Sequence, residues 1–449
     1  MIKTNTKDMT IGSPARLLLT FSMPLMLGNL FQQLYTFVDA LIVGQCVSAH
    51  ALAALGATEW LTFIMFGVIS GMTQGCSVVI ARFFGEKRIE LLKKAVYACL
   101  WLAAAGAVLF VLVGQIIIGP MLEILRTPVE VHGMTQTYLR ILYAAVPVTF
   151  FYNITAAILR ALGNSKKPLH AMMIASLGNI VFDLFFVMGL NMGIAGAALG
   201  TVLAQILAAV YCLAAVRKIE ICRLGKESRV LDGRILREEI KMGIPMGVQN
   251  IITAIGGLVV QATVNGFGIL FLTGYAAANK LYVLLEIAAT SYGQGILTYT
   301  AQNIGNGDAK RIRGGLYAAL LIGAATALIM SGIMVFAGGD IVGLFIKEHE
   351  NGAEEMIRVG YHYLCVLSLG FPLLYWLYVF RACIQGMGDS IIPMLSSLVQ
   401  VFMRVMCALL LTRMVGKEGI FWGEVLAWTG ADLLLSFICV KRISRIHGT

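Results

Sequence analysis

Twelve long apolar runs divide this chain, and they constrain its fold more than any other feature. Each is about as long as the roughly 20 residues that an α-helix needs to cross the hydrocarbon core of a membrane. The runs lie at 17–45, 52–81, 95–118, 134–157, 168–190, 194–216, 243–267, 272–301, 316–338, 358–382, 392–414 and 419–440. The sequence therefore predicts an all-α integral membrane protein with twelve transmembrane helices.

The composition excludes a soluble domain. Hydrophobic residues make up 59% of the chain and charged residues only 13%, whereas soluble domains carry about 25% charged residues. The first apolar run is too long for the h-region of a cleaved signal peptide, which has about 7–15 residues. The cysteines and histidines show no metal-ligand spacing, so we expect neither a metal site nor a cofactor, and we interpret the cysteines as small apolar packing residues.

The basic residues predict the orientation in the membrane. Alternate connections, starting at the N-terminus and counted with the residues at the adjoining span ends, hold 26 of the 34 lysines and arginines, and the opposite connections hold five. Because cytoplasmic loops are enriched in lysine and arginine, we expect both termini in the cytoplasm and a multi-pass protein of the plasma (inner) membrane. The net charge of +10 then reflects this rule, and no nucleic-acid partner is expected.

The most basic connection divides the chain into two halves. Residues 217–241 contain eight basic and five acidic residues, and we interpret them as a cytoplasmic linker that could include an amphipathic helix on the membrane surface. The expected domains are an N-terminal six-helix bundle at 1–216 and a C-terminal six-helix bundle at 242–449.

The two halves repeat each other. "SMPLMLGN" (22–29) matches "GIPMGVQN" (243–250), "QGCSVVIARFFG" (74–85) matches "QGILTYTAQNIG" (294–305), and "LRALGNSKKP" (159–168) matches "IQGMGDSIIP" (384–393). Three matches in the same order indicate a repeat. Since each half has an even number of spans, a pseudo-twofold axis along the membrane normal is predicted. Such repeats are typical of secondary transporters.

Polar side chains form a stripe on the first span. Asn29, Gln32, Thr36 and Asp39 recur at steps of three or four residues, which places them on one face of a helix. Tyr35 lies one turn before Asp39. A helix in contact with lipid on all sides would not carry this stripe, so the face must look toward protein or water.

Further polar groups in the N-terminal half predict a cation site. The fifth span carries Ser176, Asn179 and Asp183, the sixth Thr201 and Gln205, and the fourth Thr149 and Asn153. Desolvation and a neighbouring carboxylate both disfavour ionisation of a buried carboxyl group, so Asp39 and Asp183 could load and release a proton. Alternatively, oxygens of Asp39, Asn179, Asp183 and Thr201 could hold Na⁺. Purely structural roles stay open: pairing or capping for the acids, and interhelical hydrogen bonds for Asn179 and Thr201.

The C-terminal half differs at the equivalent positions. Val260 stands where the repeat places Asp39, and Arg404 stands opposite Asn179. The role of Lys280 and of Glu286 stays open, and Arg404 either pairs with Glu424 or Asp432 or handles substrate. The polar residues expected to line a substrate cleft are Gln32, Thr36, Gln261, Asn265 and Glu286.

These motifs resemble the multidrug and toxic compound extrusion (MATE) family, and in particular its DinF-like and archaeal prokaryotic branch. The resemblance covers nearly the whole chain. It rests on Pro24, Asn29 and the "YxxxD" of the first span, and on "ALAALGAT" (51–58), "GxxQG" (71–75), "LRALGNSKKP", "GNIVFD" (178–183), "GIAGAALGTVLAQ" (193–205), "IQGMGDS" (384–390) and "EVLAW" (424–428).

The resemblance implies an antiporter that exports amphipathic organic cations in exchange for H⁺ or Na⁺. By this resemblance the cation-coupling residues are Asp39, Asn179, Asp183, Thr201, Tyr35 and, as a weaker match, Asn153. Pro24 matches the proline at which the first helix is proposed to bend. Another branch of the family uses acids in the seventh and tenth spans, but the seventh span here has neither Asp nor Glu.

The sequence fits other classes of function less well. A flippase for lipid-linked precursors, the main alternative, would need a basic cavity, whereas the charges predicted inside the N-terminal bundle are acidic. A channel would need no coupling site. No nucleophile–base pair, phosphate loop or metal spacing supports an enzyme. The expected partners are therefore small organic cations and membrane lipid, and the expected state is a monomer.

Overall fold

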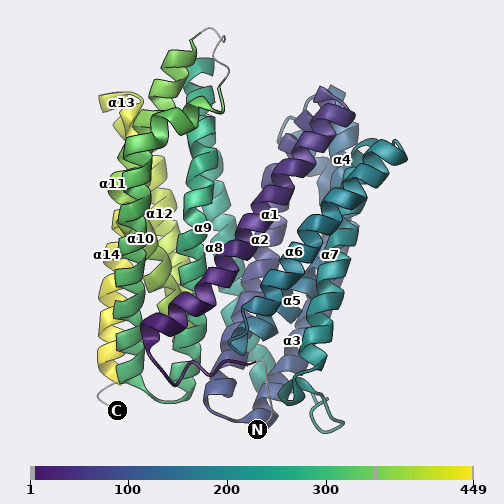
Figure 1. Cartoon of the computed structure of the whole chain (residues 1–449), viewed down its shortest axis with the longest axis vertical. Coiled ribbons are helices and arrows are strands. Elements are labelled where there is room, and N and C mark those ends of the chain that lie inside the picture. The colour runs from purple at the N-terminus through teal and green to yellow at the C-terminus, as the bar shows by residue number, and fades with distance from the viewer. Residues whose placement is uncertain (1–5, 347–351, 447–449) are drawn as a thin grey trace. The chain divides into compact units, whose positions relative to one another are not determined.

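The computed structural model describes residues 6–346 and 352–446. Within these two ranges the regular structure is entirely helical (Figure 1). Ten helices are each long and apolar enough to cross a membrane, and one bent pair forms an eleventh span. Helix α9, at 37 residues, exceeds the length that a span requires. The predicted all-α membrane protein with twelve spans is confirmed.

The first half contributes seven α-helices and two short segments of other helix types. A π-helical segment, η1, continues α6 directly, and a short 3₁₀ helix, η2, follows α7. The bounds are α1 Pro14–Cys46, α2 Ala49–Gly85, α3 Ile89–Ile124, α4 Val129–Ala144, α5 Val146–Ala161, α6 Lys166–Asp183, η1 Leu184–Gly189, α7 Gly193–Arg217 and η2 Glu220–Cys222.

The second half repeats this order with one marked difference. Its elements are α8 Gly233–Asn265, α9 Ile269–Gly305, α10 Ala309–Gly343, α11 Ala353–Gly386, α12 Ile391–Met406, η3 Cys407–Leu411, α13 Thr412–Val415 and α14 Glu418–Ile446. Again a π-helical segment, η3, continues the fifth span. Helix α11 runs unbroken past Pro372, whereas the span predicted at 134–157 is broken.

The span predicted at 134–157 is present, but two helices, α4 and α5, form it. The chain bends by 50° between α4 and α5. Pro147 follows the break directly and has no backbone N–H, so it cannot continue the hydrogen-bond ladder of α4. Pro372, its equivalent 225 residues later, lies inside a helix that stays continuous, so the two halves differ at this point.

The helices form two compact units. Unit 1 comprises the residues up to Asp8 together with Met23–Gly247, and unit 2 comprises Met9–Ser22 together with the residues from Val248 onward. In unit 1, α6 packs on α7, and α5 packs on α2, α3 and α7. In unit 2, α11 packs on α9, α10 and α14, and α12 packs on α14.

These units differ from the predicted 1–216 and 242–449 bundles at two places. The start of α1 belongs to unit 2, and the start of α8, up to Gly247, belongs to unit 1. The predicted linker at 217–241 also ends earlier than expected, because α8 already begins at Gly233. The first helix of each half therefore begins in the unit built mainly from the other half.

The repeated "QG" motifs explain this exchange of helix starts. In unit 1, Gly75 of α2 lies against the backbone of Gly243 in α8, and a Cβ atom at position 75 would collide with it. In unit 2, Gly295 of α9 lies against the hydroxyl of Ser22 in α1 in the same way. Each motif thus supplies the small residue that lets the incoming helix approach closely, as at other membrane-helix contacts.

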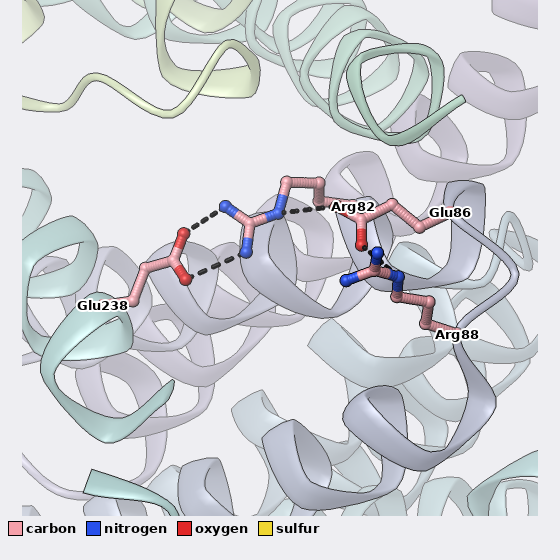
Figure 2. A network of polar contacts seen from close by, with 4 residues as sticks. All are labelled: Arg82, Glu86, Arg88 and Glu238. Atoms are coloured by element: carbon pink, nitrogen blue, oxygen red, sulfur yellow. Dashed lines mark hydrogen bonds and ion pairs between the residues drawn. The ribbon is translucent and has the colours of Figure 1, made fainter. Parts of the chain in front are cut away.

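Polar contacts hold the start of α8 in unit 1. Figure 2 shows Arg82, near the end of α2, forming a two-pronged ion pair with Glu238 of α8; the Nη2–Oε2 distance is 2.9 Å. Arg82 also contacts Glu86 at 3.4 Å, and Glu86 contacts Arg88 at 3.7 Å. Such planar, bidentate pairing with a carboxylate is specific to arginine.

Candidate functional site

Two buried carboxyl groups form the centre of the candidate site in unit 1. Asp39, on α1, is 7% exposed, and Asp183, the last residue of α6, is fully buried. The two side chains lie close enough to interact electrostatically. Both carboxyl oxygens of Asp183, and Oδ1 of Asp39, have no hydrogen-bond partner among the described residues. A buried carboxyl group without a donor calls for a proton or a cation.

A glycine in α7 creates the space for Asp183. A Cβ atom at Gly200 would collide with Oδ1 of Asp183. The carboxyl group therefore lies directly on the backbone of α7, at the point where α6 changes into the π-helical segment η1. π-Helical turns are frequent at functional sites, and here the turn begins at the residue after the acid.

Asn179, one turn before Asp183, and Thr201, the residue after Gly200, contact each other. Asn179 is 1% exposed and Thr201 8% exposed, and Nδ2 of Asn179 donates to the Thr201 hydroxyl over 3.5 Å. The carbonyl oxygen Oδ1 of Asn179 is buried and unpaired, so it stays available to a ligand. Oxygens of this kind, with the carboxylates, are the hard ligands that alkali and alkaline-earth cations accept.

A hydrogen bond links the two helices that carry the acids. The hydroxyl of Ser176 in α6 donates to the main-chain carbonyl of Phe31 in α1 over 3.1 Å. Ser176 lies two turns before Asp183, and Phe31 two turns before Asp39. The bond therefore fixes α1 and α6 beside each other close to the acid pair.

One tyrosine of the site was predicted and another was missed. Tyr35 interacts with Asp39 from one turn earlier on α1. Tyr138, on α4, is 7% exposed and interacts with Asp39, Asp183 and Thr201. Hydropathy patterns count a tyrosine ring as apolar, although its hydroxyl usually finds a polar partner when buried. The unpaired acids opposite are the signal that could have pointed to it.

Apolar residues close the site on one side. Tyr138 belongs to a buried cluster in which the end of α1, the start of α2, α4 and α7 meet. Its other fully buried members include Val43, Ala51, Ala54, Ala197 and Ala198. A dry wall of this kind strengthens the interaction of the carboxyl groups with any cation beside them.

The other residues named from the sequence lie elsewhere. Asn153 donates to the carbonyl of Thr149 on its own helix over 2.8 Å, and it is Thr149 that reaches α7, donating to Gln205 over 2.6 Å. Pro24 lies inside the continuous helix α1, two residues after the point where α1 passes between units.

The residues expected to line a substrate cleft are divided between the units. Gln32 and Thr36 are exposed on α1 in unit 1. In unit 2, Nε2 of Gln261 donates to Asn265 over 2.9 Å on α8, and Glu286 accepts from Tyr378 over 2.6 Å and from Tyr282 over 3.3 Å. Of the five residues expected to line the cleft, Gln261 and Asn265 are hydrogen-bonded to each other. The cleft itself stays a prediction.

The partner of Arg404 is Glu424. Nη2 of Arg404 lies 2.6 Å from Oε2 of Glu424, and the two side chains are 12% and 11% exposed. Asp432, the other predicted partner, is buried and has no hydrogen-bond partner in the described part of the chain. It faces Arg381, which donates to Gln400 over 2.8 Å. Lys280 is exposed on α9.

Comparison with known proteins decides the family. The profile of the MatE family matches residues 24–185 and 245–410, which is most of both halves. The chain belongs to this family. MatE proteins, the multidrug and toxic compound extrusion family, are transporters and not enzymes.

Relatives of this MatE chain cover nearly its whole length. The probable multidrug resistance protein YpnP of Bacillus subtilis (strain 168) is 28% identical over 424 residues, which are 93% of this chain and 92% of YpnP. The multidrug export protein MepA of Staphylococcus aureus (strain NCTC 8325 / PS 47) is 23% identical over 421 residues, covering 91% and 89% of the two chains.

Solved structures share the MatE fold. A MOP superfamily transporter from Pyrococcus furiosus, described as having a binding pocket of reverse polarity that suggests a different function, superposes with a TM-score of 0.91 over 100% of both chains. Its sequence identity is 20%, so this similarity concerns the fold alone.

Proposed function

We propose that this chain is a secondary active antiporter that exports amphipathic organic cations in exchange for H⁺ or Na⁺. The observation that carries the proposal is the buried pair Asp39–Asp183, whose carboxyl groups lie together without a basic partner among the described residues. The names of YpnP and MepA, which refer to multidrug resistance and multidrug export, support the substrate class.

The acid pair suits a reversible cation. Two carboxylates side by side in a dry site repel each other, so binding of one proton or one Na⁺ relieves that repulsion. We propose Oδ1 of Asn179, which is buried and unpaired, and the hydroxyls of Thr201 and Tyr138 as further ligands of this ion. An ion bound here would then neutralise charge inside unit 1, where α1 and α6 meet.

Exchange follows if the ion and the drug favour different states of the protein. In alternating access the site faces one side of the membrane at a time, and a ligand shifts that equilibrium only by its differential affinity for the two states. We propose that both termini lie in the cytoplasm, that the drug enters from that side, and that loading of Asp39 and Asp183 from outside favours drug release. Pro24 is the proposed hinge of α1.

A lipid-linked precursor flippase is the alternative of the same superfamily. Its pyrophosphate substrate would call for basic side chains, and the buried titratable groups of the site in unit 1 are acids and tyrosines. The names of the relatives likewise refer to drug export. We therefore do not favour this function.

Efflux of ethidium from cells that express the protein tests the proposal. Asp39→Asn and Asp183→Asn keep the shape of each side chain but remove the titratable group, and we expect both to abolish efflux. Asp340→Asn, an exposed acid on α10, is the matched control and should transport normally. Wild-type efflux by a correctly folded Asp39→Asn variant would end the proposal.

A further inference from the structure

Unit 2 contains a structural equivalent of the candidate site in unit 1. Helix α12 repeats α6: they begin at Ile391 and Lys166, carry Pro393 and Pro168 as their third residue, and both run into a π-helical segment. By this register Arg404 corresponds to Asn179 and Ala408 to Asp183, because all these pairs are 225 residues apart.

The next span of each half keeps the same correspondence. Three glycines recur at the same spacing in both halves, Gly193, Gly196 and Gly200 in the first and Gly416, Gly419 and Gly423 in the second. Gly196 lies against the backbone of η1 and Gly419 against the end of η3. Since the residue after the third glycine is Thr201 in one half and Glu424 in the other, these two positions are equivalent.

The same pair of positions is in contact in both units. In unit 1, Nδ2 of Asn179 lies 3.5 Å from the Thr201 hydroxyl. In unit 2, Nη2 of Arg404 lies 2.6 Å from Oε2 of Glu424. The geometry of the site is thus retained, while its chemistry has changed from a neutral hydrogen bond to an ion pair.

The charged residues around this pair of positions differ between the two units. Unit 1 has carboxyl groups at positions 39 and 183, and the equivalent residues of unit 2 are Val260 and Ala408. The carboxylate in direct contact with Arg404 is that of Glu424, and buried Glu286, which accepts hydrogen bonds from Tyr378 and Tyr282, interacts with the same guanidinium. Tyr275, Tyr282 and Tyr363 also face the guanidinium of Arg404, and Tyr378 and Arg381 interact with it as well.

The sizes of the side chains at equivalent positions differ as well. Gly256 on α8 is the equivalent of Tyr35 on α1, because these two residues are 221 positions apart, as are Pro24 and Pro245. A Cβ atom at Gly256 would lie 2.9 Å from Val401 and 3.7 Å from Nη1 of Arg404. The long side chain of Arg404 therefore extends toward the place that a tyrosine takes in unit 1.

The recess around the ion pair is already filled. It leaves no room for a water molecule, and its lining consists of Val260, Arg404, Ala408, Gly419, Ile420, Gly423 and Glu424. Three of these residues, Val260, Ala408 and Glu424, are the equivalents of Asp39, Asp183 and Thr201.

We propose that unit 2 retains the cation site of the repeat with the guanidinium of Arg404 as its permanently attached cation and Glu424 as its ligand. What the intact site does in unit 1 rests on the function proposed above. The consequence is that unit 2 does not take up the coupling ion, so that one half alone responds to it. Without the Arg404 side chain, the site should accept a free monovalent cation, and guanidinium fits it best.

Removal of the attached cation and addition of a free one tests this. Arg404→Ala leaves Glu424 buried and unpaired, which lowers the melting temperature of the purified protein. Millimolar guanidinium chloride should raise that Tm by several degrees in a saturating manner, whereas tetramethylammonium chloride at the same concentration, a cation too large for the recess, should not. Wild-type protein should show no such rise.

The matched control removes the ligand as well. In Arg404→Ala/Glu424→Gln the carboxylate that contacts Arg404 is gone while Glu286 stays, and guanidinium should have no specific effect. An equal rise in Tm in this double variant, or no rise in a folded Arg404→Ala variant, would overturn the proposal.

Arg404→Asn, which restores the residue of unit 1, provides a second route should Arg404→Ala fail to fold. Recovery of either variant only when guanidinium is present during purification would support the site, and failure of both with guanidinium present would refute it. The readout is stability and not transport, so it stands or falls separately from the test of Asp39.

Discussion

The carboxyl group of Asp183 lies directly on the backbone of Gly200, because α7 has no side chain at that position. This contact places the acid between α6 and α7 with both oxygens unpaired. The site therefore requires glycine at position 200 as well as the two acids.

Gly200→Ala should therefore disable transport while the protein still folds. The added Cβ would displace the Asp183 side chain, and overpacking of this kind costs about 1–3 kcal/mol. Ethidium efflux should fall close to that of Asp183→Asn, with a modest decrease in Tm. Gly133→Ala, on α4 with nothing within 4 Å of the new atom, is the control and should transport normally. Normal efflux by Gly200→Ala would show that the position of Asp183 is not important.

Tyr138→Phe should change the ion dependence of efflux without unfolding the protein. The substitution removes only the hydroxyl that faces Asp39, Asp183 and Thr201, and the apolar cluster around the ring stays intact. We expect efflux to reach its half-maximum at a different external pH or Na⁺ concentration. An unchanged ion dependence would exclude the hydroxyl from the site. Tyr317→Phe, an exposed tyrosine of unit 2, serves as the comparison.

The ion pair Arg82–Glu238 should contribute little to the free energy of unfolding, but its contribution should depend on having opposite charges at these two positions. Its side chains are 26% and 34% exposed, and ion pairs with such access to solvent are worth about 0.2–1 kcal/mol. Arg82→Glu and Glu238→Arg should each lower Tm, and the double reversal should recover most of the loss. A double variant that is no more stable than the sum of the single changes would mean that the contact in Figure 2 does not hold α8 to α2.

Much of this architecture could be predicted because membrane spans have a fixed minimum length. The twelve runs follow from hydropathy, the polar faces that carry Asp39 on α1 and Asn179 and Asp183 on α6 follow from helical periodicity, and the repeat follows from matched motifs. The break before Pro147 did not follow, since the same proline at position 372 leaves its helix continuous.

The packing between spans was less predictable. A hydropathy profile does not show that Gly75 receives α8 and Gly295 receives α1, so the exchange of helix starts between units was missed. The partner of Arg404 was undecided between Glu424 and Asp432, because depth counted along ideal helices ignores the π-helical segment η3 that begins three residues after Arg404. Tyr138 was missed because its ring reads as apolar.

Ethidium accumulation in proteoliposomes under an imposed gradient tests the central claim most directly. Wild-type protein should accumulate the dye when a pH gradient or a Na⁺ gradient of the proper direction is applied, and the gradient that works identifies the coupling ion. Asp39→Asn should accumulate none under either gradient, although it is folded and inserted. Gradient-driven accumulation by Asp39→Asn at the wild-type rate would contradict the account.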